Sequence, residues 1–386
     1  MMKSTAFTVT GLFCWSILGL ATAHEYVVQL TSETSLNSFL ESNSLNNLDE
    51  PVDKIVIGSD FHGFSGEFED EVMSELYGDP RVASISIDRM LYLQEYLRQN
   101  DAPEHLARLS NGVSNSRVSA KNENAFIFHS HAGIGVDVYI VDSGIDSQHP
   151  AFMNRHISKL IDLTDNPIPV GDPHGHGTAI AGLVTSDTFG VMKKANLFDV
   201  RVVDAESNGV KLSKLLKSLE FIENHSRATM RPSVAVLPFS MSKNAILNSA
   251  IESMPNSIAI VVPAGNQHHM ACNFSPASAR NSQSILSVGS LDYRSSIEIA
   301  SFSNYGECVD VFTSGVQMDT LHATTNSDEN YISKVSGTSM SCAIAAGTVG
   351  YYMSLGLSSV EAIEKIKSAK EILVSGEAIK ELKLTL

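Results

Sequence analysis

The sequence is poor in cysteine and basic residues, has one tryptophan, and has only one long apolar run. Its 27 lysines and arginines face 43 aspartates and glutamates, which gives a formal net charge of −16. A nucleic-acid partner would need a basic face, so we expect none. There is no internal repeat and no low-complexity tract. The 386 residues, 43% of them hydrophobic, suffice for a large core and more than one domain.

The single long apolar run lies at the N-terminus, over residues 11–20. A basic residue precedes it, and the A-x-A site Ala21-Thr22-Ala23 follows. This pattern is typical of a secretory signal peptide over residues 1–23, and the run is short for the alternative, an uncleaved anchor. No later segment approaches eighteen apolar residues. We therefore predict a protein of the secretory pathway, extracellular or vacuolar/lysosomal, without a stable membrane anchor.

One of the four cysteines falls in this leader. The others are Cys272, Cys308 and Cys342. In an oxidising compartment they allow one disulfide, in any of three pairings, and one free thiol. Two N-glycosylation sequons, at Asn224 and Asn273, fit the same route and predict a glycoprotein.

After the leader, two blocks differ in pattern. Residues 24–97 predict a small α+β domain, with strands at 26–30, 54–57 and 81–87 and an amphipathic helix at 68–77. The polar stretch 99–124 is typical of a linker.

Apolar runs and helical patterns alternate in the second block. The runs lie at 136–141, within 191–203, and at 234–237, 258–262 and 285–288, with helices predicted near 212–222 and 245–254. Continuous apolar strands separated by helices indicate an α/β fold, a buried parallel sheet with helices on both faces.

Two polar residues stand where such a sheet binds ligands, outside the carboxyl ends of its strands. Asp142 and Asn266 each follow an apolar strand, and His176 would begin a helix of small residues. His174 is a rival in a Gly-Pro-rich loop, where we expect it to be solvated. Ser339 opens GTSMSCAIAAG, which taken alone could be either a nucleophile or a small-residue helix in a core.

Together Asp142, His176 and Ser339 occur in the chain order Asp…His…Ser, the order of subtilisin. The motifs DSGI, HGTAIAG, PAGN and GTSMS closely resemble those of the subtilisin-like serine proteases. SFSNYG and NFSPAS resemble the proteinase K-like branch. The resemblance covers nearly all of the second block and implies a serine endopeptidase of polypeptide substrates that requires no cofactor. We expect it to act as a monomer.

The resemblance also implies a role for each residue. Ser339 would attack the scissile carbonyl, His176 would carry its proton, and Asp142 would hold the imidazole. Asn266 would donate to the oxyanion together with the Ser339 backbone N–H.

The first block resembles the inhibitor-type propeptide of the same family. FHGFSGEF, residues 61–68, resembles the turn between that domain's middle strands, and DAPEHLARLS, residues 101–110, resembles the start of mature enzymes. We therefore predict a self-processing zymogen with propeptide 24–97 and peptidase domain 98–386, cut within residues 96–100 and preferably between Leu97 and Arg98. The propeptide would aid folding and block the cleft. The alternatives are a permanent accessory domain or an inhibitor that acts in trans.

The sequence departs from the family pattern at three places. Ala179 and Ala343 replace a histidine and a proline, and alanine suits a first helical turn. Residues 238–242, Pro-Phe-Ser-Met-Ser, replace the cleft segment Ser-Leu-Gly-Gly. Proline has no N–H, and Ser240 and Met241 would stand where glycines leave room for the P1 side chain of a substrate. We predict a narrowed pocket and a restricted substrate range. The alternative function is a catalytically impaired fold that binds peptides or the wall matrix.

Two further residues match or adjoin family positions. Asp310, in CVDVF, matches a calcium ligand of the proteinase K-like branch, so the resemblance allows a structural calcium there. Cys342 lies three residues after Ser339, and we expect it to be a small buried residue.

Overall fold

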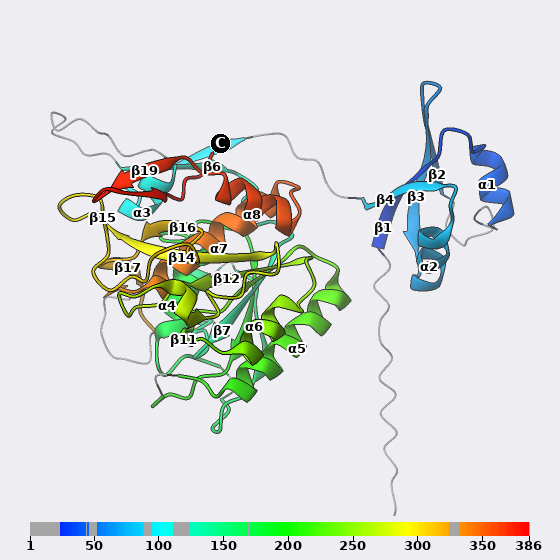
Figure 1. Cartoon of the computed structure of the whole chain (residues 1–386). Coiled ribbons are helices and arrows are strands. Elements are labelled where there is room, and N and C mark those ends of the chain that lie inside the picture. Colours follow the sequence, from blue (N-terminus) through cyan, green and yellow to red (C-terminus); the bar gives the residue numbers. More distant parts are fainter. Residues whose placement is uncertain are drawn as a thin grey trace, which may run out of the picture. The chain divides into compact units, whose positions relative to one another are not determined.

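The computed structural model describes residues 24–43, 45, 52–88, 95–110, 124–153, 155–168, 170–207, 209–323 and 332–385. The chain forms two compact units, Met1–Leu93 and Gln94–Leu386 (Figure 1). The predicted signal peptide, residues 1–23, lies outside the described residues. No helix within the described ranges is long and apolar enough to cross a membrane.

The first unit is an α+β domain, as predicted. Its four strands form an antiparallel sheet in the order β2-β3-β1-β4. They are β1 (His24–Leu30), β2 (Asp53–Ile57), β3 (Phe61–Phe68) and β4 (Val82–Ile87), with helices α1 (Leu36–Ser42) and α2 (Asp70–Gly78). Val28, Phe39 and Phe64 are fully buried in its core.

The expected turn at FHGFSGEF is wrong, because this segment is strand β3 itself. It pairs with β1 on one side and β2 on the other, and the turn precedes it at residues 58–60. A Cβ on Gly63 would lie 2.5 Å from the Val28 carbonyl oxygen. Gly63, which in the sequence suggests a turn, therefore allows strands β3 and β1 to approach closely.

The second unit is built on an eight-stranded sheet in the order β15-β14-β12-β10-β7-β9-β8, with β16 also paired to β14. All pairs are parallel except β14 with β15. The strands are β7 (Asp137–Asp142), β8 (Ile157–Asp162), β9 (Asn196–Arg201), β10 (Ser233–Val236), β12 (Ile258–Pro263), β14 (Ile285–Asp292), β15 (Glu298–Ile299) and β16 (Val311–Ser314).

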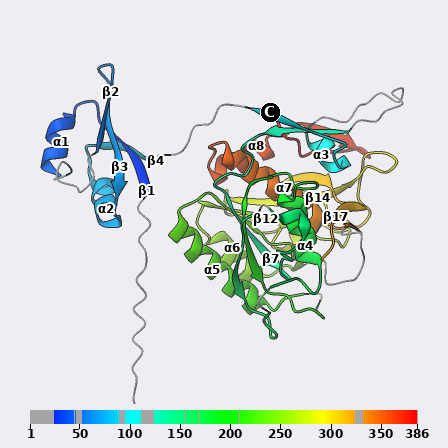
Figure 2. The same cartoon turned by 180° about the vertical axis from the view of Figure 1, so that it is seen from behind.

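Helices cover both faces of this sheet (Figures 1 and 2). They are α4 (His176–Thr185), α7 (Thr338–Ser354) and α8 (Ser359–Lys367) on one face, and α5 (Leu212–Thr229) and α6 (Ala245–Glu252) on the other. Strand β7 shows the division, since Val138 and Ile140 join the core under α4 and α7, and Tyr139 and Val141 join the core under α5. The predicted α/β architecture is confirmed. Antiparallel pairs also lie outside the large sheet, among them β17 (Met318–Leu321) with β18 (Ile332–Val335), and β19 (Glu371–Val374) with β20 (Glu377–Lys380).

The prediction of a linker over residues 99–124 is wrong for the first half of this stretch, which contains the end of a strand and a helix. Strand β5 (Tyr96–Asn100) pairs with β6 (Ala125–His129), and helix α3 (Glu104–Leu109) buries Leu106 and Leu109 in the core of the second unit. Most of β5 is exposed, which explains its polar composition. The favoured cut between Leu97 and Arg98 falls inside this strand.

Candidate active site

The four candidate residues are carried by element ends at one edge of the parallel sheet. Asp142 ends β7, and Asn266 follows β12. Strand β10 lies between these two strands, so all three carboxyl ends are adjacent. His176 is the first residue of α4, and Ser339 is in the first turn of α7.

His176 is paired with Asp142. The Nδ1 atom of His176 lies 2.8 Å and 3.0 Å from the two carboxylate oxygens, and the Ser143 backbone N–H donates to Asp142 Oδ1 at 2.7 Å. Asp142 is only 1% exposed. A Cβ on Gly177 would lie 2.2 Å from the Gly144 carbonyl oxygen, so glycine is needed for α4 to approach this turn.

Two opposing effects act on the pKa of His176. Burial alone would lower it, but the charge and hydrogen bond of Asp142, with the charge of Asp172, raise it above its ordinary value of 6.5. With Nδ1 bound to the carboxylate, Nε2 is left for proton transfer. The rival His174 is half-buried rather than solvated, and its ring centroid lies 6.3 Å from that of His176.

The Ser339 hydroxyl donates to the Pro238 carbonyl oxygen at 3.2 Å, and in this structure it makes no hydrogen bond to His176. Pro238 lies two residues after the end of β10. Cys342, one turn further along α7, is fully buried, with its Sγ 3.2 Å from the Val261 carbonyl oxygen. Burial raises the pKa of this thiol well above its ordinary value, so Cys342 is the inert buried residue that was expected.

The side chain of Asn266 is held through its carbonyl oxygen, Oδ1, which accepts two hydrogen bonds. The Thr338 backbone N–H and hydroxyl both donate to Asn266 Oδ1, at 2.9 Å and 2.8 Å. Asn304, fully buried in the SFSNYG segment, donates to the Ala264 carbonyl oxygen at 2.9 Å and accepts from the Gln267 backbone N–H at 3.0 Å. The loop that carries Asn266 is thereby fixed.

Sequence reasoning gave no role to two buried residues that support the Asp142 turn. Asp172 accepts from the Ser143 hydroxyl and from the backbone N–H groups of Gly175 and Thr178, each at 2.8 Å. Arg201, 1% exposed, donates through Nε to the Ser143 carbonyl oxygen at 2.9 Å. Asp172 lies four residues before the histidine motif HGTAIAG, which was the only signal available for it, and nothing local marks Arg201.

The sequence profile of the subtilase family matches residues 133–373, which contain all four candidate residues. This chain belongs to the subtilase family of subtilisin-like serine proteases. It is 33% identical to the subtilase-type proteinase RRT12 of Saccharomyces cerevisiae, over 88% of this chain and 76% of that protein. It is 34% identical to a cuticle-degrading serine protease of Arthrobotrys oligospora, over 76% of this chain and 68% of that protein.

A solved subtilase structure supports the fold assignment. The crystal structure of a cold-adapted subtilisin-like serine proteinase matches with a TM-score of 0.64 and 27% sequence identity. The match covers 74% of this chain and 99% of that one. Most of the second unit is therefore the shared subtilase fold.

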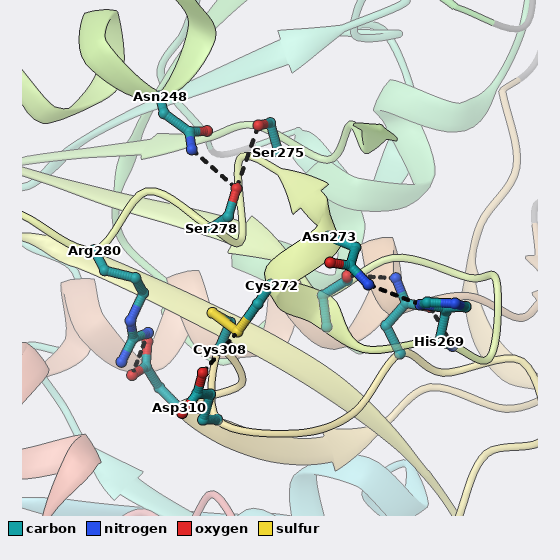
Figure 3. The surroundings of a disulfide bond; sticks show 12 residues. Asn248, His269, Cys272, Asn273, Ser275, Ser278, Arg280, Cys308 and Asp310 are labelled. Carbon is teal, nitrogen blue, oxygen red and sulfur yellow. Dashed lines mark hydrogen bonds and ion pairs between the residues drawn. A yellow bond between two sulfur atoms is a disulfide. The ribbon is translucent and has the colours of Figure 1, made fainter. Parts of the chain in front are cut away.

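One of the three cysteine pairings is realised in this subtilase. Cys272 and Cys308 form a disulfide, and Cys342 is free (Figure 3). Cys272 precedes β13 (Phe274–Ser275), which pairs with β11 (Met241–Ser242) of the cleft segment. The disulfide thus ties down a strand that borders the cleft.

The surroundings of Asp310 do not fit the calcium ion that the subtilase resemblance allows there. Its Oδ1 accepts from Arg280 Nη1 at 2.8 Å (Figure 3) and lies 3.4 Å from Lys367 Nζ. Its Oδ2 accepts from the Ser287 backbone N–H at 2.8 Å. Calcium needs six to eight oxygen ligands, whereas both oxygens here are engaged and two cations face the carboxylate. The described residues hold no cluster of three or more His, Cys, Asp or Glu side chains that could bind a metal.

Proposed function

We propose that this subtilase is an endopeptidase that hydrolyses peptide bonds with Ser339, His176, Asp142 and Asn266. The observation that carries the proposal is the pairing of His176 with the buried Asp142, set at the same sheet edge as a serine at a helix start and a fixed asparagine. A base, an orienting carboxylate, a nucleophile and an oxyanion donor together make up an acyl-transfer site.

The residues act in order on the scissile carbonyl. Ser339 Oγ forms a bond to the carbonyl carbon while its proton passes to His176 Nε2. Asp142 stabilises the imidazolium, and the Asn266 side-chain amide and the Ser339 N–H stabilise the oxyanion. His176 then gives the proton to the leaving amine as the C–N bond breaks. Water repeats the sequence on the acyl-enzyme, which releases the acid and restores the serine.

In this scheme, substrate binding displaces the Ser339 hydroxyl from its hydrogen-bond acceptor, the Pro238 carbonyl oxygen. A substrate backbone N–H beside the nucleophile would donate to the Pro238 carbonyl oxygen, which Ser339 occupies in this structure. That competition favours the Ser339 rotamer directed toward His176. Catalytic hydrogen bonds are often long or misaligned before substrate is present.

The first unit would serve as the propeptide. In this proposal the segment between the signal peptide and the cut aids folding and inhibits the cleft until the chain cuts itself. The signal peptide would direct the chain into the secretory pathway, to the exterior or to a vacuolar or lysosomal compartment. A disulfide in the structure suits that oxidising route. Asn224 and Asn273 are exposed, as glycosylation requires.

The test is the intact mass of the secreted chain, for the wild type and Ser339→Ala, in a host without subtilases of its own. We expect the wild type to lose about the first hundred residues and the variant to keep its propeptide. Ser341→Ala is the matched control, because Ser341 lies two residues on, is fully buried, and should not affect processing. If both wild type and Ser339→Ala stay folded and unprocessed, the proposal fails, and the catalytically impaired peptide-binding protein replaces it.

A further inference from the structure

The segment after β10 borders the place where a substrate side chain must enter. On the proposed function, the P1 carbonyl carbon bonds to Ser339 Oγ, its oxygen points to Asn266, and its N–H faces the Pro238 carbonyl oxygen. Gly265 directly precedes Asn266. The P1 side chain must therefore pass between the segment that begins at Pro238 and the backbone at Gly265.

Ser240 crosses this gap. Its Oγ lies 2.9 Å from the point that a Cβ on Gly265 would occupy. Gln267 Oε1 and Asn304 Nδ2 lie 2.7 Å and 2.3 Å from the same point, so polar atoms from three places converge over Gly265. The Ser240 hydroxyl thus lies close beside Gly265, in space that a glycine at position 240 would leave without a side-chain atom.

The hydroxyl of Ser240 is also unsatisfied. Its Oγ is buried and makes no hydrogen bond to any described residue. A buried polar atom without a partner costs free energy, and such atoms in native proteins need an explanation. A small polar group of a substrate could supply the missing partner.

The neighbours of Ser240 do not share this position. Met241 is 40% exposed, and its backbone pairs with Ser275 in the β11–β13 ladder. Phe239 packs against the core that α5 and α6 cover. Of the residues that replace the family's Leu-Gly-Gly, Ser240 alone stands between the walls.

We propose that Ser240 closes the P1 pocket and limits this protease to glycine, alanine or serine at P1. A protein interior is close-packed, so a leucine or phenylalanine side chain cannot enter unless Ser240 moves. A single methylene in such a pocket commonly changes kcat/KM by about 10- to 200-fold. This inference rests on the proposed function.

The experiment measures kcat/KM on peptides that differ only at P1, with Gly, Ala, Ser, Leu or Phe. We expect the wild-type enzyme to favour alanine over phenylalanine by at least about tenfold. Ser240→Gly should raise kcat/KM for leucine and phenylalanine by about 10- to 200-fold and leave alanine within about threefold. Ser295→Gly is the matched control, because it makes the same change at an exposed position outside the segment 238–242. It should leave the ratios unchanged.

A fluorophosphonate probe separates failure of this inference from failure of the proposed function. Ser339 Oγ bonds to phosphorus as fluoride leaves, whatever the shape of the P1 pocket. Suppose the probe labels the wild type but not Ser339→Ala, and peptides with phenylalanine at P1 are cleaved as well as those with alanine. This result would overturn only the role of Ser240. An unchanged ratio in Ser240→Gly, or labelling without cleavage of small-P1 peptides, would do the same. No labelling of processed, folded protein would overturn both.

Discussion

Thr338 donates two hydrogen bonds to one atom of Asn266, from its backbone N–H at 2.9 Å and from its hydroxyl at 2.8 Å. Both bonds end on Oδ1, so the side-chain amide is oriented by its acceptor, and its N–H groups donate no hydrogen bond to the described residues. Thr338 is fully buried and belongs to the helix that carries Ser339. The two donors of the proposed oxyanion site are thereby held in one rigid unit.

Removal of this amide tests its role. Asn266→Ala should lower kcat by about 10²–10³ with little change in KM, because the amide acts mainly on the transition state. Thr338→Val keeps the backbone donor and should lower kcat by a smaller factor. Steady-state kinetics on a small-P1 peptide measures both. Asn244→Ala, at the N-cap of α6, is a control that removes a fixed asparagine elsewhere. Equal losses in kcat for Asn266→Ala and this control would argue against an oxyanion role.

The raised pKa of His176 predicts a pH profile. As general base the imidazole must be neutral, so kcat/KM should rise with pH, with a midpoint above 6.5. Asp142→Asn removes the main cause of the raised pKa. It should shift the midpoint down and lower kcat by about 10⁴. The folded-state pKa exceeds the ordinary value, so protonated His176 stabilises the fold at low pH. That contribution is lost as pH rises through the folded pKa.

The control for this profile is Asp165→Asn, which removes the same charge from a side chain that is 65% exposed. It should change neither the midpoint nor kcat by more than a small factor. A midpoint at or below 6.5 in the wild type, or the same midpoint in Asp142→Asn, would show that the pair does not set the titration of the base.

The sequence marks the four candidate residues more clearly than the residues that support them. Asp142, His176, Asn266 and Ser339 each sit in a short motif at an element end, and the parallel order of apolar strands implies that these ends meet. Arg201 reaches Ser143 from a neighbouring strand, across 58 positions of sequence. No local pattern encodes such a contact, because it depends on which strands become neighbours.

Composition led to a wrong prediction of local structure in two segments, the one that contains β5 and α3 and the one that forms β3. Asn100, Asp101 and Pro103, which are typical of a linker, lie where strand β5 ends and helix α3 begins, although α3 buries its apolar side. Strand β3 contains Gly63 because the Val28 carbonyl oxygen lies close, not because the chain turns. In both segments a tertiary contact decides the conformation and outweighs the local signal.

Because two cationic side chains surround Asp310, we predict that the thermal stability of the protein does not depend on calcium. A chelator or millimolar calcium should leave the Tm unchanged, because Arg280 and Lys367 already balance the buried carboxylate. Arg280→Gln combined with Lys367→Gln leaves that charge without a cation. We expect a loss of about 1–3 kcal/mol, since both cations are partly exposed. Thermal unfolding measures both effects.

Lys217→Gln, which breaks an exposed pair with Glu220, is the control and should change the Tm little. A fall in wild-type Tm on chelation would instead mean that calcium binds and displaces the cations.

The pairing of β5 predicts where the mature chain begins. Leu97 pairs with Phe128, the Tyr96 ring lies 5.7 Å from that of His129, and the Glu95 carbonyl oxygen accepts from the Ser130 N–H. A scissile bond must lie extended across Ser339, which a bond inside a paired strand cannot do. We therefore expect N-terminal sequencing to find a mature chain that starts at or before Leu97 and keeps most of the strand. A start at Arg98 or later would mean that β5 separates from β6 during processing. The pairing of β5 with β6 would then form only when β5 is not bound in the cleft as a substrate.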